Sequence, residues 1–181
     1  MLHTLSFIGD RLERRNITWG VGGSLLLSFY KIIDKPNDID ILVDETNVIR
    51  LNEFMLSMGK PKEALNLNPY HTKDFSKYKI NGVDIDVMGG FAIKHEKGIY
   101  KLSLNQDSIV THKNINGVDI PLCSLEDWYI LYWLIPNKQE KALLIERYLR
   151  NNGVAYPQLL EEALKQPLPI EVKDSVTKLL I

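Results

Sequence analysis

Two pairs of aspartates lie in alternating sequences that are typical of β-strands. Asp38 and Asp40 alternate with isoleucine in residues 38–43, and Asp84 and Asp86 alternate with apolar residues in residues 83–87. Residues i and i+2 of a strand point to the same side, roughly 7 Å apart, so each pair places two carboxylates on one face. Two metal ions about 3.5–4 Å apart fit between such carboxylates and a substrate phosphate. For one pair alone, an acidic exposed strand face is the simpler interpretation, whereas the two pairs together favour a phosphoryl-transfer site.

The sequence Gly22-Gly23-Ser24 lies where a predicted short strand is followed by a predicted helix. Glycines allow a phosphate to approach the backbone, and the start of a helix presents unpaired N–H groups. Leu25 stands where a dinucleotide-binding fingerprint would have its third glycine, and the Gly-Lys-Ser/Thr of a P-loop is absent from the sequence. We therefore expect a phosphate-binding turn of another kind.

The elements that must position these residues alternate between helix and strand. Apolar spacing and turn residues predict helices over residues 2–15, 24–32 and 48–58, strands over 17–21 and 38–43, and hairpins at Asn81-Gly82 and Asn116-Gly117. After Ser124 the pattern is helical only, with later helices beginning at Pro157 and Glu171. This order predicts an α/β core over residues 1–122, followed by a helical appendage over residues 123–181 that packs on the core.

Composition excludes several classes of protein. The 181 residues are 45% hydrophobic and 25% charged, with 22 basic and 23 acidic side chains and a net charge of -1. A chain with this balance has no overall field for extended nucleic acid or a membrane surface. The single cysteine, Cys123, cannot form an internal disulfide, and the apolar run 128–135 is too short to cross a bilayer. We expect a cytoplasmic globular protein.

Three short segments together resemble the nucleotidyltransferase superfamily. They are Val21-Gly22-Gly23-Ser24, Asn37-Asp38-Ile39-Asp40-Ile41 and the segment from Gly82 to Gly89. The likeness is to the small minimal nucleotidyltransferase-like proteins of bacteria and archaea, and it covers about residues 15–150. It implies an α/β (α+β) fold with a small mixed sheet flanked by helices, and a helical appendage at the C-terminal end.

The resemblance also implies a reaction and a set of site residues. Such proteins move a nucleoside monophosphate from an NTP to a hydroxyl acceptor and release pyrophosphate. By this likeness Gly22, Gly23 and Ser24 bind the nucleotide, while Asp38 and Asp40 bind two Mg²⁺ ions. The third carboxylate is Asp86, because relatives place it just before an apolar-Met-Gly strand end, and Asp84 is the runner-up.

Two other functions stay open at the level of sequence. Where many relatives have a lysine, this chain has Tyr132-Trp133-Leu134, so the alternative is a catalytically inactive binding or regulatory protein, for example an antitoxin-like one. A metal-dependent glycosyltransferase is disfavoured because the chain is short.

Two regions outside the three motifs have expected roles of their own. The aromatic stripe 128–133 predicts core packing, with Tyr129 and Trp133 able to form an interface to a protein partner or a second copy. The slightly basic stretch 60–101 is either solvated surface or part of the lining of the same cleft.

Overall fold

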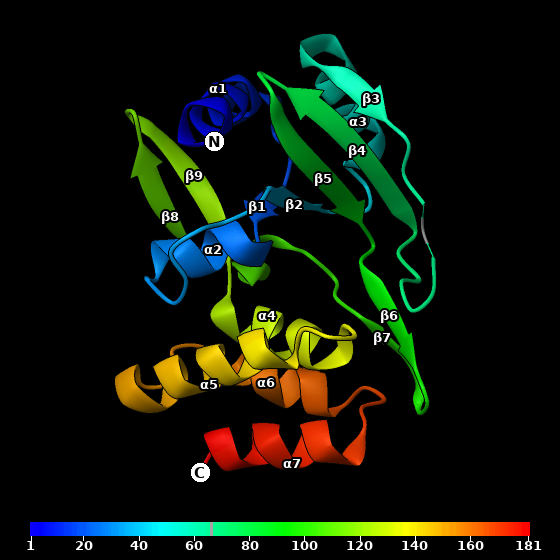
Figure 1. Cartoon of the computed structure of the whole chain (residues 1–181), viewed down its shortest axis with the longest axis vertical. Helices are drawn as coiled ribbons and strands as arrows, with labels where there is room; N and C mark the ends of the chain where they lie inside the picture. The colour runs from blue at the N-terminus through cyan, green and yellow to red at the C-terminus, as the bar shows by residue number, and fades with distance from the viewer. Residues whose placement is uncertain (66) are drawn as a thin grey trace.

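A seven-stranded mixed sheet organises the computed structural model, which describes residues 1–65 and 67–181. The strand order is β3-β4-β5-β2-β1-β9-β8 (Figure 1). The strands are β1 (Trp19–Val21), β2 (Ile39–Val43), β3 (Lys60–Lys62), β4 (Asp74–Ile80), β5 (Val83–Gly89), β8 (Ile109–Ile115) and β9 (Val118–Cys123). A separate two-stranded sheet contains β6 (Ala92–His95) and β7 (Gly98–Lys101).

Parallel pairing at the centre of the sheet brings the two aspartate-containing strands together. Strand β2 pairs in parallel with β5, and β1 pairs in parallel with β9, while the other pairs are antiparallel. Ile39 and Ile41 of β2, with Ile85 and Val87 of β5, are fully buried. Residues between them point to the opposite face, so the alternation that predicts the strands also separates an apolar face from an acidic one.

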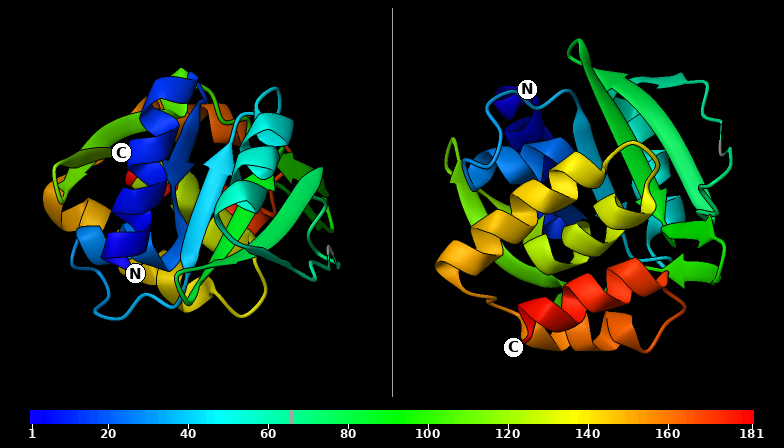
Figure 2. Two further views of the ribbon diagram at one scale, coloured as in Figure 1. Left: turned by 90° about the horizontal axis from the view of Figure 1, so that it is seen from above. Right: turned by 60° about the horizontal axis from the view of Figure 1, so that its bottom comes forward.

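Helices cover both faces of the sheet. The N-terminal helices are α1 (Leu2–Leu12), a 3-10 turn (Glu13–Arg15), α2 (Gly23–Phe29) and α3 (Val48–Met58). Helices α1 and α3 lie over the apolar face (Figure 2), where Tyr78 of β4 donates a hydrogen bond to Asn52 of α3 at 3.0 Å. Helix α2 lies against β2 on the other side.

The remaining helices follow one another at the C-terminal end of the chain. They are α4 (Leu125–Leu134), α5 (Gln139–Asn152), α6 (Pro157–Leu164) and α7 (Ile170–Leu179), and they lie together below the sheet (Figure 1). Ser124 caps α4, since its Oγ accepts a hydrogen bond from the Asp127 N–H at 2.9 Å. The buried carboxylate of Glu126 accepts hydrogen bonds from the N–H groups of Ala155 and Tyr156. This carboxylate therefore ties the α5–α6 connection to α4.

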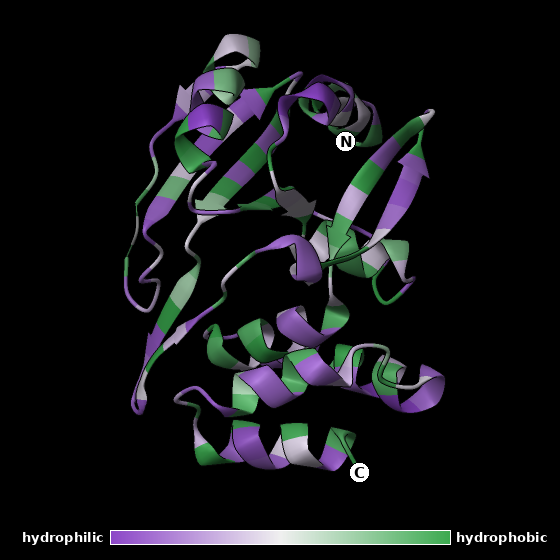
Figure 3. Cartoon of the chain, turned by 180° about the vertical axis from the view of Figure 1, so that it is seen from behind, coloured by the Kyte–Doolittle hydropathy of each residue, from purple (hydrophilic) through white to green (hydrophobic). Residues whose placement is uncertain are grey.

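The structure confirms the predicted fold class of a mixed sheet flanked by helices, followed by helices alone. Both Asn-Gly hairpins form, with positive φ at Asn81, Gly82, Asn116 and Gly117, as a type I′ turn requires. Figure 3 shows polar and apolar residues alternating along β4 and β5. The division at residues 122 and 123 stays a prediction.

Two features of the fold differ from the sequence-based expectation. The edge strand β3 was not predicted, because its sequence is Lys-Pro-Lys and all three residues are exposed. The hairpin of β6 and β7 was not predicted either, because its turn lacks an Asn-Gly pair. Within the described residues, every helix is too short or too polar to span a membrane.

Candidate active site

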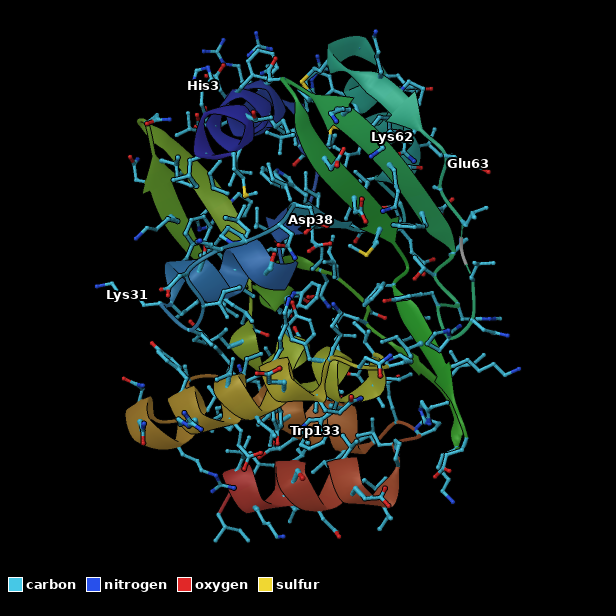
Figure 4. All side chains as sticks on the ribbon, viewed as in Figure 1. His3, Lys31, Asp38, Lys62, Glu63 and Trp133 are labelled. Atoms are coloured by element: carbon cyan, nitrogen blue, oxygen red, sulfur yellow. The ribbon has the colours of Figure 1, made fainter. Side chains whose placement is uncertain are left out.

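Three carboxylates meet where β2 and β5 run side by side. Asp38 immediately precedes β2, Asp40 lies in β2, and Asp86 lies in β5. One oxygen of each carboxylate lies within 4.8 Å of an oxygen of both others, and all three residues are half-buried. Asp38 is labelled at the centre of the molecule, between α2 and β5 (Figure 4). The site thus sits on the acidic face of the sheet, which is the face opposite α1 and α3.

The strand register explains why these residues converge. In the parallel pair, Ile39 is opposite Ile85 and Asp40 is opposite Asp86. Directly paired residues point to the same side of a sheet, so Asp40 and Asp86 are neighbours on one face. Asp84 belongs to the same strand face but is not among the three grouped carboxylates, and it forms an ion pair with Lys62 at 2.9 Å instead.

The carboxylate of Asp40 is the most strongly perturbed acid of the three. Burial, with the adjacent charges of Asp38 and Asp86, raises the pKa of Asp40 from 3.8 to about 7. The charges of Lys141 and Lys77 act in the opposite direction. An acid held in this way is disfavoured in its ionised form unless further positive charge reaches it.

Lys77 is the nearest basic side chain to the three aspartates. It lies in β4 directly opposite Asp86, and its Nζ forms an ion pair with Asp86 Oδ2 at 2.8 Å. The side chain of Asp86 is 15% exposed and that of Lys77 is 34% exposed. Burial raises the pKa of Asp86, and the Lys77 hydrogen bond acts against that rise.

The Gly22-Gly23-Ser24 turn lies against the aspartates. Gly23 has φ +61, and a Cβ at this position would overlap Asp40 Oδ2, whereas a Cβ at Gly22 would overlap the indole of Trp128. The Ser24 hydroxyl accepts a hydrogen bond from the Asn37 N–H at 3.2 Å. Close approach by a side chain and a left-handed backbone both require glycine here. The turn therefore helps to shape the carboxylate site.

A cavity of about 340 Å³ opens beside the three carboxylates. It is bounded by the sheet on one side and by α4 and the start of α5 on the other. Its lining residues are Ser24, Asn37, Asp38, Asp40, Leu65, Tyr70, Thr72, Phe75, Lys77, Asp86, Met88, Phe91, Trp128, Tyr132, Ile135, Lys138 and Lys141. The volume is in the range of small-molecule sites. Among the described lining residues, Asp38, Asp40 and Asp86 are the only carboxylates.

One wall of the cavity is aromatic. Phe91 stacks on Trp128 with ring centroids 6.3 Å apart, and Trp128 contacts Tyr132 at 5.2 Å. Tyr70 extends this wall through Phe91, at 6.3 Å. A continuous set of ring faces is suited to a flat or apolar part of a ligand.

Two lysines reach the cavity from the helical side. Lys138 immediately precedes α5 and Lys141 lies in its first turn. The Nζ of Lys141 lies 5.2 Å from the ring centre of Tyr132. Burial and the charge of Lys138 lower the pKa of Lys141, against the effect of Asp40 and Asp38. Together with Lys77, they give the cavity three cationic side chains.

Most of the residues singled out from the sequence lie together. Asp38, Asp40, Asp86 and Ser24 line the cavity, and Gly22 and Gly23 lie directly behind it. Of the lysines in the basic stretch 60–101, Lys77 alone is among the described lining residues. The expectation for Tyr129 as an interface residue is wrong, because its side chain is fully buried and donates a hydrogen bond to Glu146 at 3.1 Å. Trp133, labelled among the C-terminal helices in Figure 4, is half-buried.

Several lining residues were not singled out from the sequence. Tyr70, Phe91, Lys138 and Lys141 come from loops and from a helix whose placement the sequence pattern does not specify. Lys77 is different, because the Asn81-Gly82 turn sets the hairpin register that places it opposite Asp86. A register argument could therefore have found Lys77.

Comparison with solved structures identifies the architecture. A presumed nucleotidyltransferase from Thermotoga maritima, TM1012, aligns with 83% of this chain and 93% of its own, with a TM-score of 0.62 and 24% identity. This chain has the nucleotidyltransferase fold. The solution structure of the antibiotic-resistance factor ANT(2'')-Ia aligns over 99% of this chain and 88% of its own, with a TM-score of 0.56 and 15% identity.

A crystal structure of ANT(2'')-Ia in complex with adenylyl-2''-tobramycin also aligns with this nucleotidyltransferase fold, with a TM-score of 0.51 and 15% identity over 98% of this chain and 94% of its own. No protein-family model matches the sequence, and no curated protein matches it. The likeness is therefore one of fold, and the chemistry has to be argued from the site itself.

Proposed function

We propose that this protein is a metal-dependent nucleotidyltransferase, which moves a nucleoside monophosphate from an NTP to a hydroxyl acceptor and releases pyrophosphate. The observation that supports this most strongly is the convergence of Asp38, Asp40 and Asp86 within 4.8 Å, in the wall of a cavity large enough for a nucleotide-sized ligand. The shared fold supports the proposal too, since one structure with that fold contains an adenylylated antibiotic.

The three carboxylates fit divalent magnesium. Mg²⁺ prefers oxygen ligands and is commonly held by a few carboxylates together with substrate phosphates. The raised pKa of Asp40, caused by burial and by the charges of Asp38 and Asp86, is the mark of a site that lacks compensating charge. Asp38, Asp40 and Asp86 would hold two Mg²⁺ ions. When bound, the ions would neutralise the charge of the triphosphate and of the reacting oxygens.

The other polar residues would bind and orient the nucleotide. Lys138 and Lys141 bring positive charge to the wall of the cavity formed by the start of α5, where the outer phosphates would lie, and Ser24 also lines the cavity. The aromatic wall of Phe91, Trp128 and Tyr132 would hold the base or the apolar part of the acceptor. These lysines would also supply the positive charge that the family resemblance leads us to expect from a lysine near residues 132–134, where this chain has Tyr132-Trp133-Leu134.

The transfer itself needs one proton acceptor. The acceptor oxygen attacks the α-phosphorus, the bond from that phosphorus to the oxygen bridging to the β-phosphorus breaks, and pyrophosphate leaves. Asp86 would take the hydroxyl proton, because it lies on β5 directly opposite Asp40 and lines the cavity that the acceptor would enter. Positioning and charge compensation would supply most of the rate enhancement.

The charge of the lining also bears on the acceptor. A net charge of -1 provides no extended basic surface for nucleic acid, so a small-molecule hydroxyl is the favoured acceptor. Because no described lining residue adds a carboxylate to the three aspartates, a polycationic acceptor would find no partners once metals are bound.

The experiment is label transfer from ATP and the other NTPs. The protein with Mg²⁺ is incubated with a small-molecule fraction of bacterial extract, in parallel with α-³²P and γ-³²P nucleotide. The proposal predicts α-label in a new product and γ-label in pyrophosphate. Asp86→Asn should abolish both signals, whereas Asp84→Asn should retain them, because Asp84 lies outside the grouped carboxylates.

Two results would reject the proposal in different ways. Release of γ-label as inorganic phosphate would indicate an NTP phosphatase instead, and γ-label in a new product would indicate a kinase. Binding of Mg²⁺ and NTP without transfer to any fraction would favour the catalytically inactive binding or regulatory protein.

A further inference from the structure

Lys77 lies beside Asp86, where a metal ion bound to the three carboxylates would also place its positive charge. Its β4 position is opposite Asp86, and Asp86 is opposite Asp40. The three side chains therefore form one row of alternating partners across three adjacent strands, with Lys77 at the end of the row. All three line the cavity.

The ion pair of Lys77 and Asp86 is close and partly shielded from water. The two charged atoms are 2.8 Å apart, and Asp86 is only 15% exposed. Lys79, two residues further along the same strand face, forms a weaker pair with Asp84, at 4.0 Å and with both side chains about half-exposed. The Lys77 pair is thus the one that neutralises a member of the carboxylate cluster.

This pair and a metal ion compete for the same carboxylate. An ammonium group held against Asp86 would be repelled by divalent ions bound to that cluster. Lysine has a flexible four-carbon stem that can turn its charge to another partner. The anion that the proposed reaction brings into the cavity is the triphosphate, so a displaced Lys77 would meet a phosphate.

We propose that Lys77 exchanges partners: it holds Asp86 while the carboxylate cluster lacks cations, and it binds a nucleotide phosphate once cations are bound. This inference rests on the proposed function for its nucleotide half. Metal and nucleotide then bind cooperatively, because each favours the arrangement in which Lys77 has left Asp86.

The test measures binding of Mn²⁺, used as a probe for Mg²⁺, by isothermal titration with and without a non-hydrolysable ATP analogue. Lys77→Met should tighten binding of Mn²⁺ alone by about fivefold to tenfold and weaken binding of the analogue with Mn²⁺ by a similar factor. Lys77→Arg keeps the positive charge and should bring the dissociation constants of Mn²⁺ and of the analogue back toward the wild-type values. Lys77→Gln repeats the test in case the Met variant folds poorly, which circular dichroism will show.

Two matched controls separate partner exchange from a general charge effect. Lys79→Met removes a lysine from the same strand face but outside the cavity lining, and should change neither constant. Lys141→Met removes a cavity lysine that contacts the Tyr132 ring rather than a carboxylate. It should weaken the analogue while changing Mn²⁺ binding much less than Lys77→Met does.

The outcomes distinguish this inference from the proposed function. If Lys77→Met weakens the binding of both ligands or changes the binding of neither, Lys77 does not exchange partners. The same conclusion follows if Lys141→Met tightens the binding of Mn²⁺ as much as Lys77→Met does. If the wild-type protein binds neither Mn²⁺ nor the analogue, the proposed function fails and the inference fails with it.

Discussion

Replacement of Asp40 by asparagine should stabilise the metal-free protein. Asp40 is held beside Asp38 and Asp86 within 4.8 Å, and its carboxylate is ionised at the cost of burial and repulsion. Asparagine has nearly the same shape and no charge, so the variant removes the repulsion while keeping the packing against Gly23. The same variant should lose the stabilisation that Mg²⁺ gives.

The magnitude follows from the pKa of Asp40. It lies at about 7 in the folded protein, against an ordinary value of 3.8, and each pKa unit is worth about 1.36 kcal/mol. The ionised Asp40 therefore destabilises the folded protein by at most about 4 kcal/mol. We expect the free energy of unfolding of Asp40→Asn to exceed that of wild type by about 2–4 kcal/mol at pH 8. Because the folded protein binds this proton more tightly than the unfolded chain, the difference is absent below pH 3.8 and grows as pH rises to about 7.

The assay is urea denaturation at several pH values between 3.5 and 8.5, in EDTA or in saturating Mg²⁺. At a concentration about 100 times its Kd, Mg²⁺ should stabilise wild type by about 2.7 kcal/mol and should leave Asp40→Asn unchanged. Asp84→Asn is the matched control. Its carboxylate is exposed and paired with Lys62, which lowers the pKa of Asp84, so removing its charge should not stabilise the protein.

A metal-free Asp40→Asn variant that is less stable than wild type at pH 8 would refute this account of the site's electrostatics. If Mg²⁺ raises the free energy of unfolding of the variant as much as that of wild type, the assignment of Asp40 as a metal ligand is refuted.

Three further predictions follow from single residues. Gly23→Ala should lower the free energy of unfolding by about 2 kcal/mol or more, measured by denaturation, because the added Cβ overlaps Asp40; Gly82→Ala, which has positive φ in open space, should cost only its backbone strain. Glu126→Ala should cost about 2–4 kcal/mol by leaving the N–H groups of Ala155 and Tyr156 unpaired, and Glu126→Gln should cost less; equal losses would contradict this role. Tobramycin, a polycation, should not become labelled in the α-³²P assay, and a labelled product would show that the acceptor argument is wrong.

The central part of the fold could be predicted because its signals are local. The alternation of isoleucine and aspartate specifies strands β2 and β5, and the positive-φ pair Asn81-Gly82 specifies the hairpin of β4 and β5. The strand β3 has no such signal: it pairs Lys60 with Lys79 and Lys62 with Lys77, so it is held by backbone pairing rather than by apolar burial. Lysine and proline suit an exposed edge strand, but they do not predict one.

The carboxylate cluster could be predicted in part. The sequence identified Asp38, Asp40 and Asp86 as candidates, but the choice of Asp86 over Asp84 relied on family resemblance. The parallel register, which pairs Asp40 with Asp86, provides the physical reason, and parallel register depends on contacts far apart in sequence. The position of Lys77 follows from the two-residue turn alone, since the pairing of Ile80 with Val83 carries through to Lys77 and Asp86.

The opposite wall of the cavity could not be predicted. Phe91 lies in a connection between strands, and Lys141 lies in a helix whose docking depends on the packing of α4 and α5. Trp128 and Tyr132 were expected in the core, and they are buried there. That they also line the cavity follows only from where α4 meets the sheet.

Anomalous diffraction from a crystal grown with Mn²⁺ and a non-hydrolysable ATP analogue tests the central claim most directly. The account predicts two Mn²⁺ peaks bounded by Asp38, Asp40 and Asp86, with the analogue's phosphates on their open side and its base or sugar in the cavity. Mn²⁺ and the analogue bound elsewhere, with the three carboxylates metal-free, would contradict it.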